Sequence, residues 1–177
     1  MKKIIFIVAL LFGINLSLFA QLKEGDGMLG PSLGLWTAPQ SPTFGLNYEY
    51  QMAQLGDVST ISLGGVFRYS TFRDNPTPNY YNYNYLTLGL QSNLNFNTIA
   101  NGRFVPFVGL VLGYNYVNSN YYTNDGTVYS AGYTSGLWLW GQFGMRYFFS
   151  QRVAGSLRFG AGNFNFNVLE LGIDFKL

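Results

Sequence analysis

Apolar and polar side chains alternate with a period of two along most of this chain. From residue 44 to residue 52, for example, every even-numbered position is apolar or aromatic, and every odd-numbered position is Gly, Asn, Glu or Gln. Because successive side chains of a β-strand point to opposite faces, this alternation predicts strands with two chemically different faces. We expect eight strands, near residues 29–36, 44–52, 61–69, 86–96, 108–116, 137–147, 153–160 and 169–177.

The predicted connections between these strands differ in length. Three are short, at residues 54–57, 97–102 and 149–151. Two are long, at residues 70–82 and 117–132. Short turns at one end and long loops at the other are typical of outer-membrane barrels, whose periplasmic turns are short. The brief connections at 37–42 and 161–163 depart from this pattern.

The two faces of the predicted strands carry different chemistry. One face is apolar and uncharged over seven strands, whereas all strand charges lie on the other face: Glu49, Arg68, Arg146, Arg158, Glu170, Asp174 and Lys176. A soluble lipocalin-like barrel and an outer-membrane barrel both fit this division. Seven charges are too few for a soluble outer surface but suit a narrow polar lumen. Glycines on the charged face leave room for large inward residues such as Phe107, Trp138 and Trp140.

Aromatic residues gather at both ends of the predicted strands. One group lies next to the long loops: Tyr69, Tyr85, Tyr114, Tyr116 and Tyr133. The other group lies next to the short turns: Tyr48, Tyr50, Phe96, Phe104, Tyr147 and Phe175. Two aromatic belts around an aliphatic band match the two interfaces of a bilayer, so this distribution favours the membrane barrel.

Three segments resemble the family of small eight-stranded outer-membrane β-barrel proteins. Residues 104–114 are similar to its strand with a Pro-aromatic pair and spaced glycines, residues 144–148 to the strand-to-turn segment that follows, and residues 169–177 to the carboxy-terminal insertion signal. The resemblance implies an all-β fold, an eight-stranded antiparallel up-and-down transmembrane β-barrel in the cell outer membrane. It also implies the membrane lipids and the barrel-insertion machinery as partners.

The composition removes most catalytic chemistry. The chain is 19% aromatic and 10% charged and has no His and no Cys, so it lacks the commonest general base, the commonest metal ligand and any thiol nucleophile. Lipid-modifying enzymes of the family that the chain resembles use a His and Ser pair. Glu170 and Asp174 are four residues apart on one strand, roughly 13 Å, which is too far for an acid–base dyad. We therefore expect no enzyme, no catalytic residue, no cofactor and no metal.

The first 20 residues have the order of a secretory signal peptide. Lys2 and Lys3 precede an apolar run from residue 4 to residue 19, and Ala20 precedes a polar stretch. The run is shorter than a membrane-spanning helix needs. We expect cleavage of residues 1–20 and a β-barrel domain at residues 21–177. The cleaved chain has eight basic and eight acidic residues, so it has no basic excess for nucleic acid.

The sequence also suggests roles for individual polar residues. We expect Arg146 and Glu170 to meet across the lumen with Arg158 nearby, because buried charges need partners. Residues 124–126 (Asn-Asp-Gly) predict a turn at a loop tip, since the acidic ligands of a calcium loop do not follow. The tyrosines of the 70–82 loop and its surroundings suit a binding surface and interfacial anchoring equally well.

These observations predict a monomeric, non-enzymatic barrel with a filled lumen. Its loops 70–82 and 117–132 would contact the outside for surface structure, adhesion or docking of an extracellular partner. One alternative is a carrier that admits a small hydrophobic compound between Trp138, Trp140 and Phe107. The other alternative is a soluble periplasmic ligand binder of lipocalin type.

Overall fold

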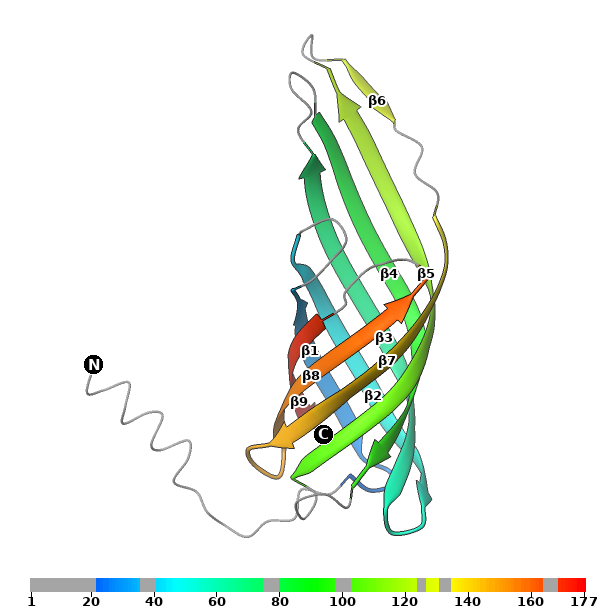
Figure 1. Cartoon of the computed structure of the whole chain (residues 1–177), viewed down its shortest axis with the longest axis vertical. Helices are drawn as coiled ribbons and strands as arrows, with labels where there is room; N and C mark the ends of the chain where they lie inside the picture. The colour runs from blue at the N-terminus through cyan, green and yellow to red at the C-terminus, as the bar shows by residue number, and fades with distance from the viewer. Residues whose placement is uncertain are drawn as a thin grey trace, which may run out of the picture.

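Eight antiparallel strands close into a barrel in the computed structural model (Figure 1). The structure describes residues 22–35, 41–74, 80–97, 103–123, 127–130, 135–163 and 169–177. The strands are β1 (Gly27–Gly34), β2 (Thr43–Leu55), β3 (Ser59–Asp74), β4 (Tyr80–Phe96), β5 (Phe104–Tyr122), β6 (Val128–Ser130), β7 (Gly136–Phe148), β8 (Val153–Gly162) and β9 (Leu169–Lys176). Each barrel strand pairs with its neighbours in the chain, β1 pairs with β9, and the short β6 adds to β5 outside the closed ring.

This architecture confirms the predicted eight-stranded up-and-down barrel. All pairings are antiparallel, and the closing pair joins Leu29 of β1 to Phe175 of β9. The predicted first strand corresponds to β1, although Trp36 lies outside the described residues, as do the predicted signal peptide and Tyr133. Among the described residues, no helix is long and apolar enough to cross a membrane.

The period of two correctly predicted which side chains point inward. Leu90, Leu110 and Leu137 on the apolar face are 65%, 63% and 67% exposed, whereas Glu49 and Arg146 on the opposite face are 1% and 0% exposed. The apolar face therefore points outward and the charged face lines the lumen. A soluble lipocalin-like barrel has the reverse arrangement.

One wall of the barrel is much taller than the other (Figure 1). β3, β4 and β5 have 16, 17 and 19 residues, whereas β1, β8 and β9 have 8, 10 and 8. The ladder with β2 ends at Tyr69 of β3, and the ladder with β7 ends at Asn115 of β5. Beyond these points the chain forms a projecting sheet, which we define as residues 71–74, 80–85, 116–122 and 128–130.

The projecting sheet corrects the predicted loop boundaries. Most of the predicted loops 70–82 and 117–132 is strand, because β3 continues to Asp74, β4 begins at Tyr80 and β5 continues to Tyr122. Aromatic residues fit strands well, and cross-strand aromatic pairs stabilise a sheet. The tips at 75–79 and 124–126, with the predicted Asn-Asp-Gly turn, lie outside the described residues.

The opposite rim is closed by short turns and by the segment that precedes β1. Gly56 lies in the β2–β3 turn with a φ of 59°, a conformation that glycine adopts without steric cost. The side chain of Leu22 is buried in an apolar cluster with Met28, Val105, Phe148 and Ala154. The side-chain amide of Asn97 donates to the Leu22 carbonyl at 3.0 Å, which holds this segment across the end of the lumen.

Candidate functional site

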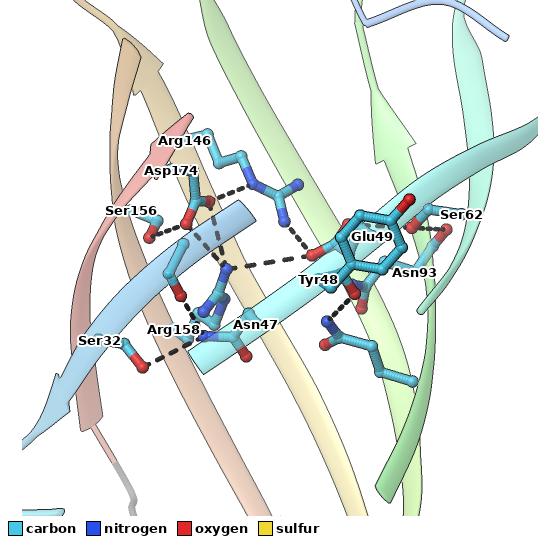
Figure 2. Close-up of polar contacts among 12 residues, drawn as sticks. Ser32, Asn47, Tyr48, Glu49, Ser62, Asn93, Arg146, Ser156, Arg158 and Asp174 are labelled. Carbon is cyan, nitrogen blue, oxygen red and sulfur yellow. Dashed lines mark hydrogen bonds and ion pairs between the residues drawn. The ribbon is translucent and has the colours of Figure 1, made fainter. Parts of the chain in front are cut away.

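Arg146 is the centre of a charge network in the lumen. Its guanidinium lies between Glu49 of β2 and Asp174 of β9, and Nε donates to Oδ2 of Asp174 at 2.7 Å (Figure 2). A further N–H donates to Oδ1 of Asn95 at 2.7 Å, and the ring of Phe107 lies 4.4 Å from the guanidinium carbon. The period of two places all of these side chains on the inner face, and closure of the barrel brings the strands together.

A second group of contacts surrounds Arg68. Its Nε and Nη2 donate to the two carboxylate oxygens of Glu170 at 2.5 and 3.0 Å, which is a bidentate ion pair. Nη2 also donates to Oδ1 of Asn47 at 2.7 Å, and Ser32 Oγ donates to Glu170 at 3.3 Å. Glu170 is therefore held by strands from two sides of the lumen.

Arg158 connects the two groups. Its Nη2 lies 3.2 Å from Oδ2 of Asp174, and its Nη1 lies 3.9 Å from Oε2 of Glu170. The same side chain is 4.0 Å from Glu49. Three arginines and three carboxylates thus form one network of zero net charge, in which each member has an opposite charge close by. Such pairing is what a buried charge requires.

The predicted pair between Arg146 and Glu170 is wrong. Arg146 is opposite Ser156 of β8, and Ser156 is opposite Gly172 of β9, so Glu170 and Asp174 lie two residues to either side of this level. Arg146 pairs with Asp174, and Arg68 reaches Glu170 from across the lumen. The predicted proximity of Arg158 to Glu170 is correct. Arg146 also pairs with Glu49, and Glu170 pairs with Arg68. The sequence predicts that Glu49 and Arg68 face the lumen, but it does not indicate these two pairs.

The large aromatic residues fill the lumen but do not share one site. Trp138 and Trp140 stack with ring centroids 5.4 Å apart and form an apolar cluster with two valines. Phe107 belongs to the arginine network instead. Glycines make the predicted room, since a Cβ on Gly160 would lie 2.1 Å from the Trp140 ring. Phe107 therefore lies with the arginines, apart from the two stacked tryptophans.

The projecting sheet is the second candidate site, and its two faces differ. Its inner face is aromatic. The ring centroids of Tyr81 and Tyr121 are 4.5 Å apart with the rings tilted by 32°, and Phe72 stacks on Tyr83 at 6.0 Å. Its outer face has asparagines between tyrosines. Because strands rather than flexible loops hold these side chains, the sheet presents a preformed surface.

No protein-family model matches the chain, and no curated protein matches it in sequence. Solved structures are similar to it in fold. The amino-terminal barrel domain of OprF from Pseudomonas aeruginosa is 11% identical with a TM-score of 0.55, and the match covers 87% of this chain and 98% of that chain. Ail, the attachment invasion locus protein of Yersinia pestis, is 10% identical with a TM-score of 0.50, over 87% and 96% of the two chains.

Neisserial surface protein A is 13% identical with a TM-score of 0.50, and the match covers 86% of this chain and 95% of that chain. At these identities the similarity concerns the fold. Together with the closed ring of eight antiparallel strands, it shows that this chain has the fold of the small eight-stranded outer-membrane β-barrels.

Proposed function

We propose that this protein is a non-enzymatic barrel of the outer membrane, which fills its own lumen and holds the projecting sheet outside the cell as a contact surface. The outward apolar belt carries the proposal. Its exposed leucines surround a barrel whose strand charges point inward at the level of this belt, and a bilayer is the environment in which that arrangement is stable.

The orientation follows from the two rims. Short turns of outer-membrane barrels face the periplasm, and here the β2–β3 and β7–β8 turns share one rim with Leu22 and Leu177. The projecting sheet extends from the opposite rim (Figure 1). In the proposed orientation this sheet therefore stands on the outer surface of the cell.

A contact role suits the projecting sheet better than transport suits the lumen. The lumen is occupied by the charge network and the stacked tryptophans, all of them buried. Ail, whose fold is similar, is named as an attachment invasion locus protein. We therefore place the function of this chain in surface contact, with an extracellular partner docking on the sheet.

Cysteine labelling in intact cells tests this proposal, because the chain has no Cys of its own. A membrane-impermeant maleimide should label Tyr129→Cys, whose parent side chain is 57% exposed on β6. Gln54→Cys, at the exposed end of β2 on the other rim, should be labelled only after the outer membrane is permeabilised. Labelling of Gln54→Cys alone in intact cells would reverse the orientation, and recovery of both variants in the soluble fraction would overturn the proposal.

A further inference from the structure

The outer face of the tall wall changes chemistry in steps along β4 and β5. The register between these strands is uninterrupted from Tyr80 to Asn95, so side chains of equal parity stay on one face. At the middle of the barrel the outward residues are leucines (Leu88, Leu90, Leu110 and Leu112), followed by a mixed step of Leu86, Tyr114 and Tyr116. Farther from the middle come four asparagines (Asn82, Asn84, Asn118 and Asn120) and then Tyr80 and Tyr122. This order matches the hydrocarbon, the interface and the headgroup layer of one leaflet.

The polar step forms a compact array, which we call the asparagine face and define by Asn82, Asn84, Asn118 and Asn120. Asn82 is paired with Asn120, and Asn84 is paired with Asn118. Tyr80 and Tyr122 stack directly beyond them with ring centroids 4.5 Å apart. The array therefore lies next to the apolar belt without a break.

A single cation borders the asparagine face. On the outer face of the projecting sheet, Arg73 is the one charged residue among the described positions, and its Nε donates to Oδ1 of Asn82 at 3.0 Å. Its guanidinium carbon also lies 4.6 Å from the centre of the Tyr80 ring. Sites for phosphates and acidic peptides gather several cations. One arginine beside four carboxamides therefore fits a neutral, polar ligand better.

A sheet face with four carboxamides, two tyrosines and one cation is a poor surface to leave in water. Asparagine ladders and stacked aromatic residues favour stacking between chains. Because the asparagine face continues directly from the lipid-facing belt, a layer of lipid headgroups is in the right place to cover it.

We propose that the asparagine face binds the neutral sugar headgroups of glycolipids in the same membrane. Each carboxamide both donates and accepts hydrogen bonds, as sugar hydroxyls do, and the stacked tyrosine rings offer an apolar surface with a polar edge. This inference rests on the proposed function, since it requires the barrel to span a membrane with the projecting sheet outward. The glycolipid would hold the wall upright and shield it from other copies.

The test uses the full barrel in phosphatidylcholine nanodiscs with and without digalactosyl diacylglycerol, a lipid with a neutral disaccharide headgroup. We expect glycolipid around the barrel to be enriched about tenfold over phosphatidylcholine, which two or three net hydrogen bonds supply. Native mass spectrometry counts the retained lipids. The quadruple variant N82A/N84A/N118A/N120A should lose the enrichment, whereas Q54A at the other rim should keep it.

A second measurement keeps the test decisive if the quadruple variant does not fold. In the natural sequence, the side-chain amide resonances of the asparagine face should shift on addition of the glycolipid, while that of Asn163, bonded to the Leu137 carbonyl, should not. Insertion without enrichment and without shifts would overturn this inference alone. Failure of the chain to insert into any bilayer would overturn the proposed function as well.

The source of the sugar is tested separately. Free digalactose, added at the same total sugar concentration to nanodiscs without glycolipid, should cause much smaller shifts than the lipid-borne headgroup. Equal shifts would assign the asparagine face to soluble glycans and overturn the headgroup proposal. Retention of an extracellular protein on this face with no sugar effect would overturn it in favour of a protein contact.

Discussion

Each arginine in the lumen is held by acidic residues from other strands, so single residues decide the stability of the closed barrel. Arg146 joins Glu49 of β2 to Asp174 of β9, and Arg68 joins β3 to β9 through Glu170. Because the network is balanced, loss of one member leaves an uncompensated charge away from water. The ion pairs therefore connect strands on different sides of the lumen and stabilise the closed barrel.

Glu170→Gln tests this at one position. The change keeps the size of the side chain but leaves Arg68 without its bidentate partner, and we expect the free energy of unfolding to fall by about 3 kcal/mol. Urea titration of the barrel in lipid vesicles measures it. Glu24→Gln, at an exposed residue outside the barrel strands, is the matched control and should be neutral. Equal stability of the two variants would show that the network does not brace the barrel.

Glycines in the lumen make room for the tryptophans, and their effect is also local. A Cβ on Gly160 would lie 2.1 Å from the Trp140 ring, whereas one on the outward Gly141 would have a backbone oxygen at 3.9 Å as its nearest neighbour. We expect Gly160→Ala to destabilise the barrel by about 1–3 kcal/mol and Gly141→Ala to be nearly neutral. In the same titration, Trp140→Ala should remove most of the cost of Gly160→Ala. Additive effects would contradict the packing argument.

At the scale of elements, strand length distinguishes the two walls of the molecule. β5 has 19 residues and the neighbouring β7 has 13, so the end of β5 extends beyond β7. Tyr–Tyr and Asn–Asn pairs between β4 and β5 continue the ladder there. The projecting sheet therefore continues the ladder of the barrel wall, and we expect its backbone to be as well ordered as the strands of that wall.

Asn84→Pro tests whether the projecting sheet is a continuous ladder. Proline cannot donate to the ladder, and Asn84 is paired with Thr71 and Asn118. We expect amide hydrogens of residues 80–83 and 118–122 to exchange faster in the variant, while those of β8 and β9 keep their protection. Fast exchange of residues 80–84 already in the natural protein would mean that this segment is a loop.

The sequence was sufficient for the ring of strands but not for the tall wall or the contacts across the lumen. In β2 the apolar and polar positions alternate strictly, so both the strand and its facing were predictable. In residues 80–85 Tyr and Asn are polar enough on both faces to resemble a loop, and only their partners in β5 make them a strand. Arg146 meets Asp174 rather than Glu170, because the stagger of the strands sets this contact and side-chain alternation does not reveal it.

At the scale of the whole molecule, the chain separates its chemistry into three zones. The six charged residues of the network are enclosed in the lumen, aliphatic side chains surround the barrel, and asparagine and tyrosine make up most of the projecting sheet. A bilayer around the belt makes this distribution stable, because water outside the belt would have to contact large exposed leucines. We therefore place the closed barrel in the outer membrane.

Heat-modifiability of the protein in isolated outer membranes tests this location. Samples are run on gels with and without boiling, and a closed barrel that resists detergent should migrate as a compact species until it is boiled. We predict this shift, in the membrane fraction, for the natural chain. A protein that is found in the soluble fraction and migrates identically in both samples would contradict the account.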